Sequence, residues 1–285
     1  MTTHFDTVTI IGPGLMGASL GLALKARGMA KTVRGVGRRQ STLDRALDAH
    51  AIDEASLELE PALRGADLVV VCTPAALVPD YLDRIRPICA QGTVVTDVAS
   101  TKQAICAHVR KAWAEPFHFV GSHPMCGSEK FGPEHADAAL YEDSVVFVEA
   151  ENGHLPEAHQ SVIELWRGVG AKVVEVSPEL HDRMVARTSH VPHVVSAALA
   201  ILSGTDDGIQ PFVGSGFRDL TRLAEGRPEI WRDICLTNAE AVAGSLRDLV
   251  RDLDVVAQAI EDGDAAALQA FFEQGRDARD KALDS

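Results

Sequence analysis

Two short segments of the sequence carry side chains suited to acid–base chemistry. The segment TDVASTK (96–102) contains Ser100, and GSHPMCGSE (121–129) contains His123. Each follows an apolar run, and open α/β sheets bind their ligands at the carboxyl ends of the strands. A neutral imidazole is a good proton acceptor near pH 7, so His123 could accept the hydroxyl proton of an alcohol during its oxidation. Taken alone, the same histidine could instead only cap the GSHP turn.

A glycine-rich segment near the N-terminus predicts a dinucleotide site. GPGLMG (12–17) follows the apolar run 7–11 and opens a helical pattern, which is the context that makes GxGxxG informative. Its glycines permit a tight turn and a close approach of the backbone to a pyrophosphate at the helix N-terminus. We expect Gly12, Gly14, Leu15, Met16 and Gly17 to bind the cofactor. Thr73 and Pro74, at the end of the run 67–73, are expected near its ribose.

The end of the second expected strand indicates which dinucleotide is bound. Sites for NAD usually place Asp or Glu there, but this chain reads GVGRRQS (35–41). A guanidinium binds a 2′-phosphate through charge-assisted hydrogen bonds, whereas a carboxylate would repel it. We therefore predict that NADP is preferred, with Arg38, Arg39 and Ser41 among its contacts. Alternatively the two arginines are solvated loop charges and NAD is accepted as well.

These residues require a sheet that brings strand ends together. Short, β-branched apolar runs occur at 7–11, 33–37, 67–73, 93–98, 117–122, 144–150 and 172–177. Most are continuously apolar, as are strands buried on both faces of a parallel sheet, and helical patterns separate the early ones. We predict an α/β Rossmann-type nucleotide-binding domain over residues 1–177.

The pattern changes after residue 178. Residues 240–261 have apolar side chains at three- and four-residue spacing, which predicts a one-sided helix. Residues 182–202 are apolar on most sides and suggest a buried helix that is kinked or begins near Pro192. We predict an all-α substrate and dimerisation domain over 178–285. Its helices are too apolar to be covered within one chain, so we expect a homodimer.

Composition narrows the class of protein. The chain has 285 residues, 46% of them hydrophobic, and a net charge of −14, which argues against nucleic-acid and anionic-membrane partners. No run is long enough for a membrane helix, and the N-terminus does not resemble a signal peptide. The five cysteines form no CxxC pair, which favours reduced thiols in the cytoplasm over disulfides or a thiolate metal site.

Five segments together resemble one enzyme family. They are GPGLMGASLGLALK (12–25), DVASTK (97–102), GSHPMCGSEKFG (121–132), HDRMVARTSHVPH (181–193) and GFRDLTRLAEGRPEIWRDICLTN (216–238). In this order they are similar to the prephenate and arogenate dehydrogenases of tyrosine biosynthesis. The resemblance implies a small-molecule substrate, prephenate or arogenate. It also implies a reaction in which ring C4 loses hydride to a nicotinamide, C1 loses carboxylate, and the ring becomes aromatic without a metal.

The resemblance also implies roles for individual residues. His123 would hydrogen-bond the ring 4-hydroxyl as hydride leaves, and Ser100 would bind the same hydroxyl or orient the imidazole. Arg222, in DLTRLA, would hold the ring carboxylate. His193 is expected near the substrate and Glu129 near the mouth of the site. His181, by contrast, is interpreted as a helix-packing residue.

Other functions remain open at this stage. The β-hydroxyacid dehydrogenases and imine-reducing relatives have a similar layout but use a lysine early in the helical domain, and this chain has none between Lys172 and Lys281. A second alternative is a non-catalytic NADP-binding sensor. Within the resembled family, the sequence does not distinguish prephenate from arogenate or from an amino-substituted prephenate.

Overall fold

The computed structural model describes residues 5–113, 118–127, 130–150, 153–204 and 208–283. The strands are β1 (Phe5–Ile11), β2 (Ala30–Val36), β3 (Glu54–Ser56), β4 (Leu68–Val71), β5 (Val94–Asp97), β6 (Phe119–Val120), β7 (Ser122–Pro124), β8 (Val145–Glu149) and β9 (Lys172–Val176). The α-helices are α1 (Leu15–Ala26), α2 (Gln40–Asp48), α3 (Leu59–Leu63), α4 (Val78–Ile85), α5 (Gln103–Ala112), α6 (Pro156–Gly168), α7 (Pro178–Val185), α8 (Val191–Gly204), α9 (Ser215–Thr221), α10 (Pro228–Thr237), α11 (Ala239–Glu261) and α12 (Ala265–Leu283). The chain forms two compact units, Met1–Asn238 and Ala239–Ser285.

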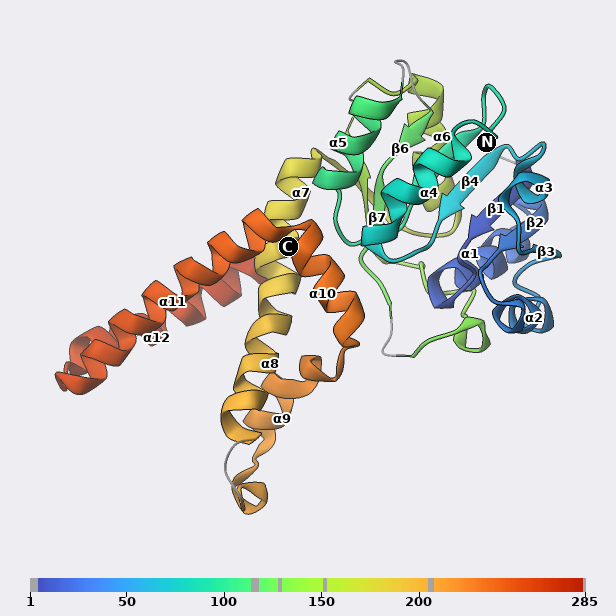
Figure 1. Cartoon of the computed structure of the whole chain (residues 1–285). Coiled ribbons are helices and arrows are strands. Elements are labelled where there is room, and N and C mark those ends of the chain that lie inside the picture. Colours follow the sequence, from blue (N-terminus) through green and yellow to red (C-terminus); the bar gives the residue numbers. More distant parts are fainter. Residues whose placement is uncertain (1–4, 114–117, 128–129, 151–152, 205–207, 284–285) are drawn as a thin grey trace. The chain divides into compact units, whose positions relative to one another are not determined.

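The first unit is built on a parallel sheet with the strand order β3-β2-β1-β4-β5-β6, covered by helices on both faces (Figure 1). Alternate residues of a strand enter different cores. In β4, Leu68 and Val70 pack with residues of α1, α2 and α6, whereas Val69 and Val71 pack with residues of α3, α4 and α5. Burial on both faces explains why the strand sequences are continuously apolar. The predicted Rossmann-type sheet is confirmed.

The strand order has a direct consequence for the cofactor site. Strand β1 lies between β2 and β4, so the chain turns to opposite sides of the sheet after β1 and after β4. Such a switch point leaves space at the carboxyl ends of the two strands for a nucleotide. The backbone N–H of Cys72, just after β4, donates to the carbonyl of Ile11 at 2.8 Å. The glycine-rich turn and Thr73 are therefore neighbours, although some sixty residues separate them in the sequence.

A second, three-stranded sheet carries His123. Its order is β7-β8-β9, with β7 antiparallel to β8 and His123 opposite Phe147. The run 117–122, expected as one strand, divides here because β6 pairs with β5 while β7 turns away to pair with β8. Strand β3 was not predicted, since Glu-Ala-Ser has no apolar run.

Helices α7 and α8 follow one another as one long rod, drawn in yellow in Figure 1. A π-helical turn, η3 (Ala186–His190), joins them, and α8 begins one residue before Pro192. The prediction that this segment is buried was wrong for α8, because only Val191 and Ser196 are buried in it. The rest of the unit's described helical part comprises α9, α10 and two 3₁₀ turns, η4 (Gln210–Phe212) and η5 (Arg222–Glu225).

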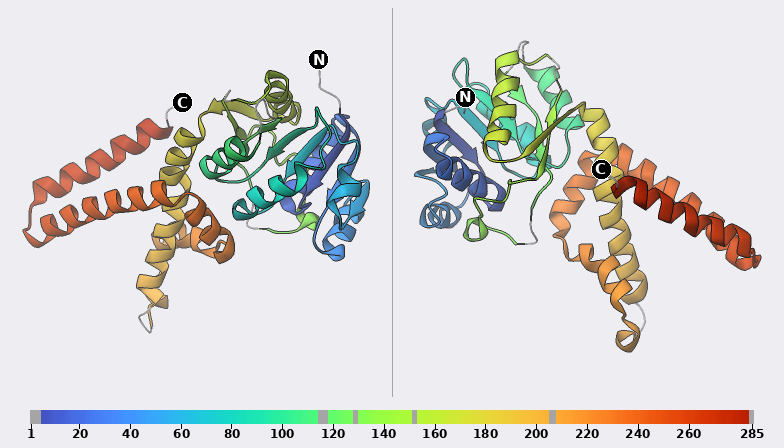
Figure 2. Two further views of the ribbon diagram at one scale, coloured as in Figure 1. Left: turned by 45° about the horizontal axis from the view of Figure 1, so that its top comes forward. Right: turned by 180° about the vertical axis from the view of Figure 1, so that it is seen from behind.

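The second unit is a hairpin of two helices, α11 and α12, which lie side by side in Figure 2. The predicted helix 240–261 agrees with α11. In the described residues, every element downstream of β9 is helical, which confirms an α/β sheet followed by a helical domain. The boundary at residue 177 stays a prediction. Across the described ranges, no helix is both long and apolar enough to cross a membrane.

Candidate active site

The glycine-rich turn between β1 and α1 has the shape of a phosphate-binding loop. Gly12 has φ +87°, and a Cβ there would lie 2.8 Å from the carbonyl oxygen of Cys72. A Cβ on Gly17 would lie 2.7 Å from the Gly12 carbonyl oxygen, so this glycine allows the helix to pack on the strand. Gly14, in contrast, faces open space at the start of α1. The first N–H groups of a helix have no intrahelical acceptor, and here they border that space beside Leu15 and Met16.

Thr73 supplies a second indication that a ligand binds at this edge of the sheet. Its Oγ1 is buried and has no hydrogen-bond partner among the described residues. An unpartnered buried hydroxyl is costly, which is why such groups usually have a partner in the functional state. Its Cγ2 lies 3.3 Å from where a Cβ on Gly12 would be, and Pro74 follows it at the surface. The turn and Thr73 therefore fit a dinucleotide.

Arg38, Arg39 and Ser41 lie at the carboxyl end of β2 and the start of α2 and are exposed. In the described part of the chain, neither arginine forms an ion pair with a carboxylate. Arg45, one turn into α2, is instead paired with Glu134 at 2.9 Å. Two uncommitted guanidinium groups thus stand at the strand end where a cofactor's adenosine ribose is bound in this architecture.

His123 projects from β7 with only 8% of its surface exposed. Burial, reinforced by His181, Lys102 and His190, lowers the pKa of His123 well below its ordinary value. The imidazole is therefore neutral at physiological pH. A neutral ring can accept a hydrogen bond or a proton, as the oxidation of an alcohol requires.

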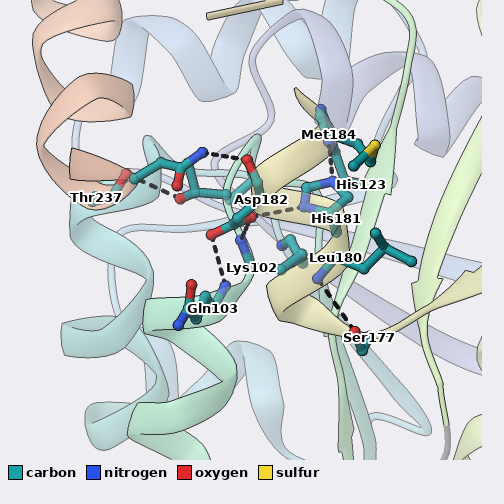
Figure 3. Close-up of polar contacts among 12 residues, drawn as sticks. Lys102, Gln103, His123, Ser177, Leu180, His181, Asp182, Met184 and Thr237 are labelled. Carbon is teal, nitrogen blue, oxygen red and sulfur yellow. Dashed lines mark hydrogen bonds and ion pairs between the residues drawn. The ribbon is translucent and has the colours of Figure 1, made fainter. Parts of the chain in front are cut away.

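A chain of hydrogen bonds starts at this ring (Figure 3). Nδ1 of His123 and Nε2 of His181 are 2.9 Å apart, and Nδ1 of His181 lies 2.7 Å from Oδ1 of Asp182. Both His181 and Asp182 are on α7 and almost fully buried. His181 is buried, as expected of a packing residue, but that interpretation missed its two ring nitrogens, which join His123 to a carboxylate.

The loop after β5 is fixed to the strand that bears His123. Lys102 forms a buried ion pair with Asp97, whose Oδ1 accepts the backbone N–H of Ser122 at 3.1 Å. The Ser122 hydroxyl donates to the Asp97 carbonyl at 2.6 Å. Ser100 lies in this loop and is half-buried. Within the described ranges, no hydrogen bond joins the Ser100 hydroxyl to His123, although the loop and the strand are held together.

His193, Trp231 and Arg222 form a second part of the site. The rings of His193 and Trp231 are stacked, with centroids 3.4 Å apart, and His193 Nδ1 donates to the Ser189 carbonyl at 3.0 Å. Burial lowers the pKa of His193, and the charge of neighbouring Arg222 lowers it further. Arg222 is exposed at the start of η5, without an ion-pair partner among the described carboxylates.

Asn238 connects the two parts. Its Nδ2 donates to the Asp182 carbonyl at 2.8 Å and to Nδ1 of His190 at 3.2 Å. The His190 ring meets the edge of Trp231, with centroids 6.3 Å apart. His123 and His193 are 70 residues apart in the sequence. In the fold a continuous series of contacts links them, through His181, Asp182, Asn238, His190 and Trp231. The site combines a neutral buried imidazole, a stacked aromatic pair and an unpaired guanidinium.

Comparison with known proteins identifies the family. Residues 20–175 match the model of the prephenate dehydrogenase nucleotide-binding domain, and residues 177–274 match that of the prephenate dehydrogenase dimerization domain. The chain belongs to the prephenate dehydrogenase family. It is 31% identical over 283 residues to the prephenate dehydrogenase of Bacillus subtilis, covering 96% of this chain and 76% of that one.

Two solved structures agree with this membership. Prephenate dehydrogenase from Aquifex aeolicus, in complex with hydroxyphenyl propionate and NAD⁺, superposes with a TM-score of 0.92 at 26% identity, covering 99% of this chain and all of that one. Synechocystis arogenate dehydrogenase superposes with a TM-score of 0.83 at 31% identity, covering 97% and 100%. These matches support a nicotinamide cofactor for this member of the prephenate dehydrogenase family. They do not favour the alternative function of a β-hydroxyacid dehydrogenase.

Family membership leaves the individual residue roles as predictions. Glu129, expected near the mouth of the site, lies outside the described residues. Asp182, Asn238 and Trp231 were not predicted, although HDRM and GRPEIWRDICLTN contain them. A carboxylate and an amide on helices are ordinary surface residues in a sequence. Only their burial, at 1% exposure for Asp182 and 5% for Asn238, distinguishes them.

Proposed function

We propose that this protein is an NADP-preferring dehydrogenase that oxidatively decarboxylates prephenate, arogenate or both. Membership of the prephenate dehydrogenase family supports the reaction. The single observation that carries the proposal is the buried, neutral ring of His123 on β7, because it meets the acid–base requirement of the reaction. The relatives named for prephenate and for arogenate are each 31% identical to this chain, so identity does not favour one substrate.

The reaction is balanced without a covalent intermediate. When bound, the nicotinamide accepts the hydride that leaves ring C4. The bond between C1 and the carboxyl carbon breaks, CO₂ departs, and the bonding pair stays in the ring, which becomes a phenol. His123 accepts a hydrogen bond from the 4-hydroxyl and so stabilises the positive character that develops at C4. Ser100 binds the same hydroxyl or orients the imidazole.

Prephenate and arogenate each carry two carboxylates, and the chain has a net charge of −14, so local cations must hold the substrate. Arg222 binds the ring carboxylate through a bidentate contact. It can do so because none of the described carboxylates forms an ion pair with it. His193, stacked on Trp231, contacts the substrate beside it.

Cofactor choice rests on the carboxyl end of β2. Arg38, Arg39 and Ser41 would bind the 2′-phosphate, while the backbone at Gly12, Gly14, Leu15, Met16 and Gly17 would hold the pyrophosphate and Thr73 and Pro74 the ribose. The absence of an acidic residue at 35–39 supports NADP over NAD. NAD is then a slower alternative cofactor.

Assembly and location complete the proposal. The dimerization-domain match to residues 177–274 supports a homodimer with the boundary of the two domains near residue 177. Five free cysteines support a reducing compartment, the cytoplasm.

The test is direct. Absorbance at 340 nm should rise when prephenate or arogenate is added with NADP⁺, and kcat/KM for the two acids identifies the preferred one. The amino-substituted prephenate is assayed in parallel. Cofactor binding without turnover of any of the three would favour the sensor instead.

A further inference from the structure

The hydrogen bonds that link Asp182, His181 and His123 determine which ring nitrogen of His123 carries the proton. This hydrogen-bond chain begins at Asp182, whose carboxylate is surrounded by donors: Oδ1 accepts the backbone N–H of Lys102 at 2.7 Å, and Oδ2 accepts that of Gln103 at 2.9 Å. These two N–H groups open α5, so the helix dipole also favours a negative charge here. An ionised carboxylate only accepts hydrogen bonds. The proton between Asp182 and His181 therefore resides on His181 Nδ1.

The next link follows from the number of protons on a neutral imidazole. With Nδ1 protonated, Nε2 of a neutral His181 has a lone pair and can only accept. Its neighbour at 2.9 Å is Nδ1 of His123, which must then be the protonated nitrogen of that ring. The reverse direction would need a second proton on His181, whose side chain has no exposed surface on which water could solvate it.

We propose that His181 and Asp182 are positioning residues that fix the tautomer of His123, leaving its Nε2 unprotonated and directed to the substrate hydroxyl. The inference rests on the proposed function for its consequence, although the tautomer itself does not depend on it. Without the chain, a neutral imidazole in water holds its proton on either nitrogen. A ring with its proton on Nε2 would offer the substrate a donor where an acceptor is required.

Other charged groups around His123 are consistent with this arrangement. Lys102 is paired with Asp97 at the end of β5, and His190 on the π turn accepts from Asn238 rather than from His123. Phe147 on β8 packs edge-on against the His181 ring, with centroids 5.3 Å apart, which holds that ring in its plane. Among the described residues, Asp182 is the carboxylate that contacts this pair of rings.

The tautomer is measured first, without substrate. Two-bond ¹H–¹⁵N NMR of histidine-labelled protein shows which ring nitrogen carries the proton, and the His123→Asn spectrum assigns the signals. We expect Nδ1 of His123 to be protonated and Nε2 to be bare. The opposite pattern would overturn the inference. Because no turnover is involved, this result is independent of whether prephenate or arogenate is the substrate.

Variants of His181 then test the consequence. His181→Leu removes the acceptor, and His181→Gln keeps an amide oxygen for Nδ1–H of His123. The control is His108→Gln: Nε2 of His108 lies 2.9 Å from Oδ1 of Asp83 in a partly exposed His–Asp pair that is not part of the hydrogen-bond chain ending at His123. A wrong tautomer in the serine-protease triad lowers kcat about 10⁴-fold. We expect His181→Leu to lower kcat by about 10²-fold or more, His181→Gln to recover part of the loss, and the control to match wild type.

The pH dependence of kcat/KM distinguishes a role of His181 in positioning His123 from a role in stabilising the fold. In the proposed arrangement a neutral His181 accepts from Nδ1–H of His123 and so favours the protonated ring. Its removal should therefore move the acid limb of kcat/KM to lower pH, while KM and cofactor affinity stay near wild type. A structural role would instead lower activity equally in both variants and leave the limb in place, which would refute the proposal. If His181→Leu fails to fold, the limb of His181→Gln and the NMR result decide.

Discussion

Two requirements meet at the ring of His123. It must stay uncharged at neutral pH, and it must be held in one orientation. Burial provides the first, since desolvation penalises the imidazolium and lowers its pKa. The antiparallel pairing of β7 with β8 provides the second, together with the contact to His181. Because the pKa of His123 is well below the ordinary 6.5, activity should persist down to mildly acidic pH and fall only when the His123 ring becomes protonated.

Replacing the imidazole should remove its chemistry and leave binding largely intact. His123→Asn is expected to lower kcat by roughly 10²–10⁴-fold, the usual contribution of a positioned acid–base group, with little change in KM. Steady-state kinetics with prephenate and arogenate provide the measurement. Near-native turnover in this variant would show that His123 has another role.

Arg222 should contribute to binding rather than to the chemical step. Loss of a charge-assisted contact to the ring carboxylate costs about 1.5–3 kcal/mol, so Arg222→Ala should weaken substrate binding by roughly 10- to 150-fold. Arg64→Ala, another exposed arginine, is the control. An unchanged KM in Arg222→Ala, with a lower kcat, would contradict the predicted clamp.

At the scale of elements, the β2–α2 turn should determine cofactor choice. Arg38 and Arg39 are exposed and unpaired in the described residues, so their loss costs the fold little. The double variant Arg38→Ala/Arg39→Ala should lower kcat/KM with NADP⁺ by about 10- to 100-fold, one charge-assisted contact or more. With NAD⁺ the value should barely change. A parallel loss with both cofactors would mean that the arginines do not bind the 2′-phosphate.

The π turn should make the fold sensitive to acid. Burial lowers the pKa of His190 from 6.5 to about 4, while the unfolded chain keeps the ordinary value. Above pH 6.5 the residue is neutral in both states and contributes nothing. As the pH falls from 6.5 to 4, only the unfolded chain takes up the proton, so the free energy of unfolding decreases, by about 2 kcal/mol at pH 5.

Urea unfolding at pH 7.5 and pH 5 measures this effect. In His190→Gln the amide oxygen can still accept from Asn238, and the decrease between the two pH values should be smaller by about 2 kcal/mol. The surface variant His108→Gln should keep the wild-type decrease. An equal pH dependence in His190→Gln and wild type would place the acid sensitivity elsewhere.

The elements and the site differ in how far the sequence could predict them. Continuous apolar runs are sufficient to locate buried strands, whereas β3 lacks that signal. His123 was found because a strand and a turn flank it. Its partner His181 lies 58 residues away, and only the fold brings the two rings within 2.9 Å. A His-Asp pair on a helix is indistinguishable in sequence from surface charge, so the chain behind His123 could not be predicted.

For the whole molecule, an apolar sequence segment indicates that its surface must be covered. It does not indicate whether the same chain or a second chain covers it. Residues 182–202 were expected to be buried because they are apolar on most sides, yet Ile201 and Leu202 are about 70% exposed. In the other unit, Leu253, Val255 and Ile260 of α11 and Phe272 of α12 are each more than half exposed. Large exposed apolar side chains in such numbers are typical of protein–protein interfaces.

A second copy of the chain is the expected partner, and one substitution tests it. Wild-type protein at micromolar concentration should have twice the 30.5 kDa mass of one chain by sedimentation or light scattering. Leu253→Arg places a charge on the apolar face of α11 and should shift the protein toward monomer, because burying an unpaired charge at an interface is costly. The matched control is Leu57→Arg, since Leu57, between β3 and α3, is 55% exposed against 52% for Leu253. It should remain dimeric. A wild-type monomer, or the same loss of dimer in both variants, would contradict assembly through the helical domain.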